Sequence, residues 1–91
     1  MSGDFTADVD RVLRRLSPGE VVTYGEVAAQ AGHPGAARAV GNLLSRSDDG
    51  YPWWRVVTTT GRLAPGHERE HARLLRAEGV MVRNGRVEVT R

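Results

Sequence analysis

Two histidines, at positions 67 and 71, enclose a glutamate in the pattern His-Glu-x-x-His. On a helix, residues four apart share one face, so His67 and His71 could hold a zinc ion while Glu68 activates a water molecule. This is the chemistry of zinc-dependent hydrolases, and it is the first reaction that the sequence suggests.

Three features argue against that zinc site. A catalytic zinc needs a third protein ligand, and the remaining histidine, His33, lies in a distant turn. The segment 67–71 is polar on all sides, and a chain of 91 residues has little room for a protease cleft beside its core. We therefore predict a solvated first helical turn, in which the helix dipole favours Glu68 and Glu70. No metal and no cofactor are expected.

The most unusual segment is Pro52-Trp53-Trp54-Arg55-Val56, which holds both tryptophans of the chain. If the strand that follows alternates from the tryptophans onward, one ring faces inward and the other outward. These rings are either a core anchor and a surface cover, or an aromatic pocket wall on which a base can stack. No acid–base pair and no hydroxyl nucleophile with a nearby histidine is evident in this stretch.

Three helices are expected before the tryptophans. Asp4 is the expected N-cap of the first, and Ser17-Pro18-Gly19 ends it. Thr23 and Glu26 form a capping-box pattern that begins a short second helix. A turn at 32–35 leads to a third helix over 36–45, and Asp48-Asp49-Gly50 ends that unit. The first helix shows one apolar face, made of Phe5, Val9, Val12, Leu13 and Leu16.

The second and third helices, joined by a short turn with glycine, match the helix-turn-helix unit, whose second helix contacts DNA. Small residues surround Arg38 on that helix and would let its backbone approach a duplex closely. The alternative is an αα-hairpin with a tightly packed alanine face. These small residues are Ala36, Ala37, Ala39 and Gly41.

The C-terminal part is expected to contain a strand ending at Gly61, a loop over 62–66 and a helix over 67–78. Gly79 would cap that helix at its C-terminus. A hairpin is expected over 80–89, because Asn84-Gly85 between alternating valines is a strong hairpin signal. The predicted fold is mostly α with a small β wing, a winged helix-turn-helix DNA-binding domain that forms a single domain over 1–91.

Composition narrows the function further. The chain contains no cysteine, which excludes disulfides, thiolate zinc sites and a cysteine nucleophile. Its basic residues are all arginine, and the balance is acidic over residues 1–30 and mildly basic afterwards. The total of +2 is a weak indication of nucleic-acid binding. No membrane span and no secretory leader is evident, so the expected compartment is the cytoplasm, or the nucleoid in a bacterium.

Four segments in this order resemble the DNA-binding domain of O6-alkylguanine-DNA alkyltransferases over about residues 4–90. The enzymes carry Pro-Cys-His-Arg-Val, whose cysteine accepts the alkyl group, and Trp53 stands at that position here. This substitution resembles the alkyltransferase-like proteins, which bind alkylated guanine without repairing it. The segments are 22–28 (Val-Thr-Tyr-Gly-Glu-Val-Ala), 36–41 (Ala-Ala-Arg-Ala-Val-Gly), 52–57 (Pro-Trp-Trp-Arg-Val-Val) and 77–79 (Ala-Glu-Gly).

The resemblance implies roles for individual residues. Arg38 would enter the duplex through the minor groove and fill the gap left by an extruded nucleotide, although it could instead be a simple phosphate contact. Tyr24 would press on the 3′ phosphate of that nucleotide, or be an aromatic at the rim of the core. Trp53 would line the base pocket, and Trp54 and Arg55 are assigned to the same pocket.

Departures from the family pattern limit this carry-over. Glu78 matches the glutamate that orients the enzymes' histidine, but Trp54 replaces that histidine, so Glu78 is either vestigial or a structural hydrogen-bonding group. We expect no counterpart of the enzymes' separate N-terminal domain. Some relatives place an arginine in the loop that closes over the base, whereas residues 63–66 contain none. Arg62 is a possible substitute.

The function predicted from these residues is non-enzymatic recognition of O6-alkylguanine in double-stranded DNA by nucleotide flipping. The family implies that nucleotide excision repair proteins are partners, and we expect a monomer. The alternative is a winged-helix regulator that reads an operator through the major groove, although Arg38 and Asn42 make a poor set of base-reading residues.

Overall fold

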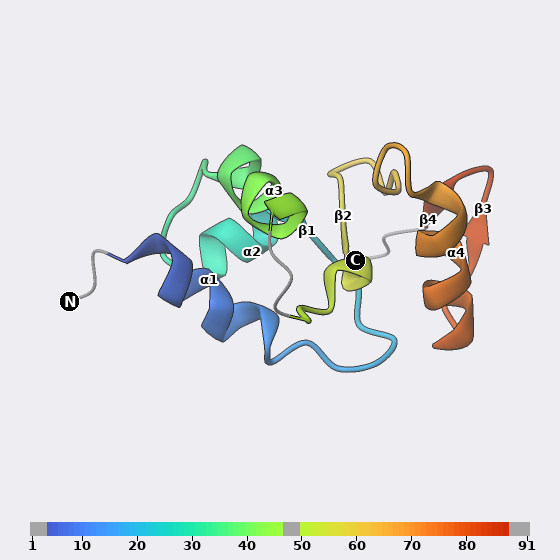
Figure 1. The fold of residues 1–91 in the computed structure, drawn as a ribbon, viewed down its shortest axis with the longest axis horizontal. Coiled ribbons are helices and arrows are strands. Elements are labelled where there is room, and N and C mark those ends of the chain that lie inside the picture. Colours follow the sequence, from blue (N-terminus) through green and yellow to red (C-terminus); the bar gives the residue numbers. More distant parts are fainter. Residues whose placement is uncertain (1–3, 47–49, 88–91) are drawn as a thin grey trace.

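The computed structural model describes residues 4–46 and 50–87. Four α-helices and two small sheets occur in that part of the chain (Figure 1). The elements are α1 (Phe5–Leu13), β1 (Val22–Thr23), α2 (Tyr24–Gln30), α3 (Ala37–Arg46), the 3-10 helix η1 (Trp53–Arg55), β2 (Val56–Val57), α4 (Glu68–Ala77), β3 (Val82–Arg83) and β4 (Arg86–Val87). The predicted helices are confirmed, with bounds shifted by only a few residues.

Helices α1, α2 and α3 pack around one aliphatic core, which we call the helical region. Asp4 caps α1 as predicted, since its carboxylate accepts a hydrogen bond from the Ala7 backbone N–H at 3.2 Å. Val9, Leu13 and Val27 are fully buried between the helices, and Val40 anchors α3 against them. The apolar spacing in the sequence thus correctly predicts the inner face of α1.

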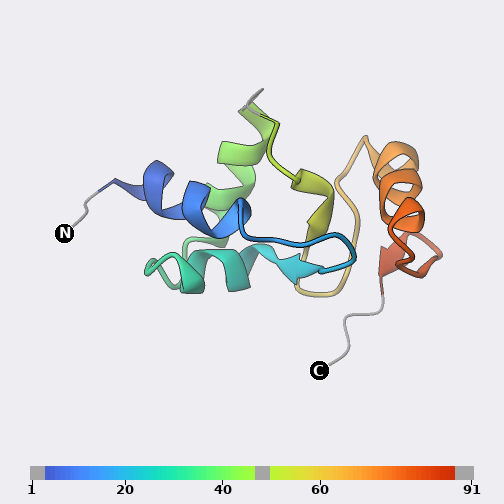
Figure 2. The same ribbon diagram turned by 90° about the horizontal axis from the view of Figure 1, so that it is seen from below.

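The two short strands that flank the helix-turn-helix unit pair in parallel. Val22 lies opposite Val56 and Thr23 opposite Val57, so β1 lies beside β2 (Figure 2). This long-range pairing was not predicted, because two-residue strands carry no alternation to read. It places the start of α2 close to the segment that contains both tryptophans.

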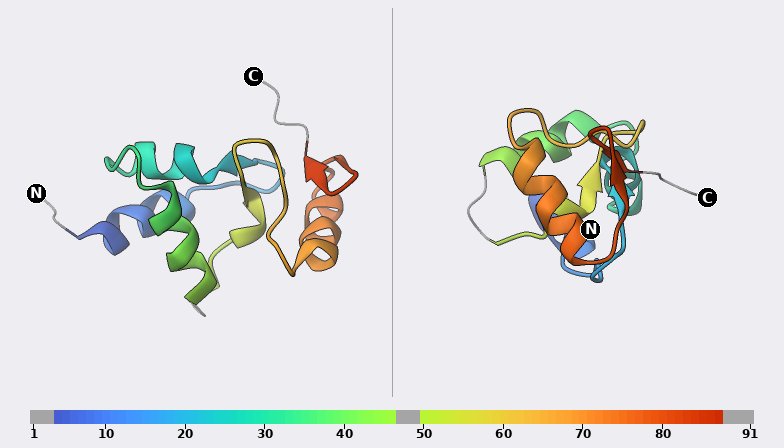
Figure 3. Two further views of the ribbon diagram at one scale, coloured as in Figure 1. Left: turned by 90° about the horizontal axis from the view of Figure 1, so that it is seen from above. Right: turned by 90° about the vertical axis from the view of Figure 1, so that its right-hand side faces the viewer.

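Helix α4 and the β3–β4 hairpin lie at the opposite end of the molecule from α1 (Figure 3). With η1 and β2 they make what we call the C-terminal region. Its smaller core contains Leu63, Leu75, Val82 and Val87. The predicted Asn84-Gly85 turn is confirmed, with φ of 54° and 72°, both in the left-handed region that such a turn requires.

These elements give a mostly helical, winged-helix-like fold, as the sequence predicts. Two expected features, the turn residues 48–49 and the strand end 88–89, lie outside the described residues. Within residues 4–46 and 50–87, no helix is long and apolar enough to cross a bilayer.

Candidate nucleic-acid interface

Tyr24 is the first residue of α2, and its position is fixed by the capping box before it. The Thr23 hydroxyl accepts from the Glu26 backbone N–H at 3.0 Å, and the Glu26 carboxylate accepts from the Thr23 N–H at 2.8 Å. The half-buried Tyr24 ring lies over Gly41 of α3, where an added Cβ would be 3.9 Å from the ring. Burial raises the pKa of the Tyr24 hydroxyl, so it stays protonated and able to donate.

A pocket of about 320 Å³ opens beside Tyr24, between α3 and the N-terminal end of α4. Trp53 contributes an aromatic wall, and α3 contributes one side. The volume lies in the range of small-molecule sites. The lining residues are Tyr24, Gly41, Leu44, Ser45, Trp53, Ala64 and His67. Of the predicted site residues, the structure therefore brings Tyr24 and Trp53 together.

The two tryptophans lie on a 3-10 turn, so the expectation that an alternating strand separates them is wrong. The strand begins only at Val56. The Trp53 and Trp54 ring planes stand 89° apart, with centroids separated by 6.2 Å. Trp53 lines the pocket, whereas Trp54 packs against the core of the C-terminal region. The turn sends the two rings to different environments without placing either one fully in solvent.

Glu78 is the centre of a polar network, which we call the Glu78 hub. Its carboxylate accepts from the Trp54 indole N–H at 2.7 Å and from two nitrogens of Arg55 at 2.7 and 3.1 Å. It also accepts from the Gly19 backbone N–H at 2.7 Å. These donors, Arg55 above all, lower the pKa of Glu78 to about 2, so the carboxylate is ionised at neutral pH.

Trp54 and Arg55, which the sequence assigns to the base pocket, take part in the Glu78 hub and are not among the residues that line the pocket of about 320 Å³. The Arg55 guanidinium stacks over the Trp54 ring at 5.1 Å and also donates to the Leu16 carbonyl at 3.0 Å. Its side chain is only 13% exposed. In the described part of the chain these two side chains therefore join η1 to α4 and to the loop after α1. Of the two readings of Glu78, this geometry favours the structural one.

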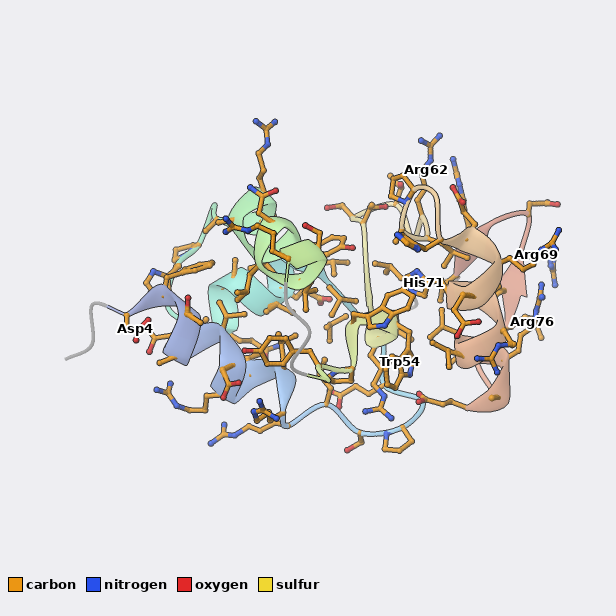
Figure 4. All side chains as sticks on the ribbon, viewed as in Figure 1. Asp4, Trp54, Arg62, Arg69, His71 and Arg76 are labelled. Atoms are coloured by element: carbon orange, nitrogen blue, oxygen red, sulfur yellow. The ribbon has the colours of Figure 1, made fainter. Side chains whose placement is uncertain are left out.

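His71 lies fully buried between α4 and η1 (Figure 4), so the prediction of a solvated helix start is wrong at this residue. The Ala64 N–H donates to His71 Nδ1 at 3.0 Å. Nδ1 is therefore unprotonated, and Nε2 donates to the Trp54 carbonyl at 2.8 Å. Burial lowers the pKa of His71 and keeps it neutral.

The same two hydrogen bonds leave His71 with no ring nitrogen free for a metal. The His-Glu-x-x-His spacing is present on α4, but its second histidine is used to hold the loop at Ala64 and the turn at Trp54. What the sequence did not reveal is that His71 belongs to the apolar side of α4, because polar residues precede it at 67–70. Ala72 and Leu75, buried with His71, continue that side.

Arg38 projects from the first turn of α3 and is exposed. It does not line the pocket, but it lies on the same helix as Gly41, Leu44 and Ser45, which do. Arg62, the possible substitute for a loop arginine, is exposed at the outer rim, whereas His71 lies inside (Figure 4). The residues of this loop and of the helix start that line the pocket are instead Ala64 and His67.

Sequence reasoning missed four side chains at the pocket: Leu44, Ser45, Ala64 and His67. Their types give no signal, since leucine, serine and alanine occur on any helix or loop. His67 was considered only as a metal ligand. Its ring lies 6.3 Å from that of Trp53, at 64°, and this contact depends on how α4 packs against η1.

Comparison with known proteins agrees with this geometry. Residues 4–80 match the family described as the 6-O-methylguanine DNA methyltransferase, DNA binding domain. A "DNA base-flipping protein" of Escherichia coli K12 is 41% identical over 93 residues, covering 96% of this chain and 71% of that protein. A protein of the same name from Vibrio parahaemolyticus is 37% identical over 82 residues, covering 86% of this chain and 82% of that protein.

Solved structures give the same result. S. pombe Atl1, in a complex with damaged DNA containing O6-carboxymethylguanine, superposes with a TM-score of 0.75 at 30% identity, covering 87% of this chain and 78% of that one. The O6-methylguanine methyltransferase of Mycobacterium tuberculosis gives 0.71 at 35% identity, covering 86% of this chain and 50% of that one. The chain belongs to the family of the 6-O-methylguanine-DNA methyltransferase DNA-binding domain, among its alkyltransferase-like members.

Proposed function

We propose that this protein recognises O6-alkylguanine in double-stranded DNA by flipping the modified nucleotide into the pocket beside α3. The observation that carries the proposal is the pocket itself. It joins Tyr24, the side of α3 that carries Gly41, Leu44 and Ser45, and the Trp53 ring in one hollow of about 320 Å³. A flat aromatic wall suits a stacked base. Two relatives that are named for base flipping are 41% and 37% identical to this chain.

The roles of the residues follow from their positions. Arg38, exposed at the start of α3, is the group that replaces the extruded base in the stack. Flipping costs a few kcal/mol of lost stacking and pairing, and an inserted guanidinium recovers part of that cost. Tyr24, with its hydroxyl protonated, contacts the adjacent phosphate, and Trp53 stacks on the flipped base.

We propose that binding is not followed by alkyl transfer. The sequence contains no cysteine, and Trp53 stands where the repair enzymes keep their acceptor thiol. The Glu78 hub fits a structural use of what is a catalytic position in those enzymes, because its carboxylate is occupied by Trp54 and Arg55. The lesion would then be handed to nucleotide excision repair proteins by a single-domain monomer.

The test compares two duplexes that differ by one O6-methylguanine, at one fixed salt concentration, with tryptophan fluorescence as the readout. We expect tighter binding and stronger quenching with the modified duplex, because the flipped base stacks near Trp53. Equal binding to both duplexes would refute lesion recognition. Strong preference for one unmodified sequence would support the winged-helix regulator instead.

Arg38→Ala tests the flipping step. We expect about a tenfold loss of affinity for the modified duplex with no change in thermal stability, since the side chain is exposed. The matched control is Arg69→Ala, which removes the same charge from an exposed position on α4, away from α3 (Figure 4). Equal losses in the two variants would reduce Arg38 to a general phosphate contact.

A further inference from the structure

His67 is one of the four pocket residues that neither the composition nor the family pattern assigns. It is exposed, and its ring meets Trp53 edge-on with centroids 6.3 Å apart. In the described part of the chain, no hydrogen bond of the structure involves the His67 ring. Its nitrogens are therefore available to a group that enters the pocket.

The main chain around His67 is held from both sides. The His67 N–H donates to the Ala64 carbonyl at 3.0 Å, and the Gly66 N–H donates to the Glu68 carboxylate at 3.1 Å. The buried His71 in turn accepts from the Ala64 N–H. This loop is thereby fixed beside the pocket before any ligand arrives, and a fixed donor binds with a smaller entropic cost.

The other side chains that line the pocket are neutral. Helix α3 contributes Gly41, Leu44 and Ser45, η1 contributes Trp53, the loop contributes Ala64, and α2 contributes the protonated Tyr24. On α4 itself, His71 is neutral and fully bonded. The neighbouring Glu68 carboxylate is engaged by the Gly66 N–H. Among the described lining residues, His67 is thus the side chain able to present a positive charge.

We propose that His67 is a specificity-determining residue, which binds the O6 substituent of the flipped guanine and selects substituents ending in a carboxylate. The proposal rests on the proposed function, since it needs a base in the pocket. A base stacked on Trp53 would bring its substituent near the His67 ring, because the two rings adjoin. An imidazole donates a hydrogen bond to a carboxylate, and the bond is stronger when the ring carries a charge.

The chemistry also predicts the direction of a pH effect. Histidine is the side chain that ordinarily gains its charge between pH 8 and 5, while a carboxylate stays ionised over most of that range. Acidification should therefore strengthen binding of a carboxylate-bearing lesion relative to a neutral lesion of the same size. Using the ratio removes the general effect of acid on DNA affinity.

The experiment measures dissociation constants for three duplexes, containing guanine, O6-isobutylguanine or O6-carboxymethylguanine at one position. The two substituents have the same heavy-atom skeleton and differ in charge. We expect the carboxymethyl-to-isobutyl affinity ratio to rise roughly fivefold between about pH 8 and about pH 6. In His67→Gln, which keeps a donor but gains no charge, and in His67→Phe, which keeps the flat ring, that rise should disappear.

The outcomes separate the two proposals. If neither lesion binds more tightly than guanine, the proposed function fails. If both lesions bind but the ratio is the same at both pH values, or the variants keep the rise, the role of His67 is overturned while lesion recognition stands. Because His67 is exposed, both variants should unfold at the parent's temperature, so a folding defect would be seen separately.

Discussion

The helical region and the C-terminal region are each stabilised by a different kind of internal contact. In the helical region, α1, α2 and α3 bury valine, leucine and alanine side chains against one another. The C-terminal region has a smaller apolar core, and two polar groups, Glu78 and His71, join α4 to η1 within it. An apolar core tolerates small shifts, whereas a buried polar network loses several bonds when one member is changed. The pocket is lined by α3 on one side and by η1 and the start of α4 on the other, so its shape depends on the polar contacts that join α4 to η1.

The strongest test of this difference removes the charge of Glu78. Glu78→Gln should lower the free energy of unfolding by about 3 kcal/mol, because the buried Arg55 guanidinium is left without a negatively charged partner. Urea unfolding measures the loss. The control is Glu70→Gln, whose exposed pair with Arg73 should contribute little. Equal effects in both variants would show that the hub is an ordinary surface contact.

The acid side of the stability curve tests both polar groups. The pKa of Glu78 is lowered from 4.5 to about 2, so its stabilising contribution is complete above pH 4.5 and is lost as the pH falls towards 2. His71 is kept neutral, so the unfolded chain gains a proton first as the pH falls below 6.5. Acid destabilisation should therefore begin near pH 6.5 and steepen below 4.5.

Thermal unfolding of the parent, His71→Gln and Glu78→Gln as a function of pH measures this destabilisation. The His71→Gln variant should lose the destabilisation that begins near pH 6.5, and the Glu78→Gln variant should lose the steeper destabilisation below pH 4.5. If both variants show the same pH dependence of stability as the parent, the assignment is contradicted.

Backbone packing inside the C-terminal region gives the next effect. Gly61 has φ of +83°, and an added Cβ would overlap the Val87 carbonyl oxygen. Gly66 has the same φ with open space around it. Gly61→Ala should therefore destabilise by about 2 kcal/mol more than Gly66→Ala, because both variants bear the strain of positive φ and only one has the clash. Similar unfolding midpoints would mean that the hairpin can move away from the loop.

The smallest effect belongs to the cap of α2 in the helical region, which is a contact between residues three apart in the chain. Thr23→Ala removes the hydroxyl that caps α2 and should cost about 1 kcal/mol. Thr23→Ser keeps the hydroxyl and serves as the control. Since Tyr24 follows directly, lesion affinity should fall more in the alanine variant than in the serine variant. A loss as large as that of Glu78→Gln would remove the contrast between the two regions.

Much of the fold was predictable because local signals agree with it. The apolar spacing of α1, the Thr23–Glu26 capping box and the Asn84-Gly85 turn each act within a few residues, and each appears where predicted. That the chain carries no cysteine is likewise read from the sequence without any structure. Together with the four family-like segments, which occur in the family's order, these local signals predict a winged-helix-like DNA-binding fold.

Only the tertiary structure decided what the adjacent and paired residues do. Trp53 and Trp54 look equivalent in the sequence, yet the 3-10 turn directs one to the pocket and the other to Glu78. His67 and His71 form one motif, yet packing of α4 on η1 buries the second ring and leaves the first beside Trp53. The physical reason is that burial and hydrogen-bond partners come from segments up to 59 residues apart, as between Gly19 and Glu78. A local sequence pattern spans only a few residues and therefore does not show which distant segments will meet in the folded chain.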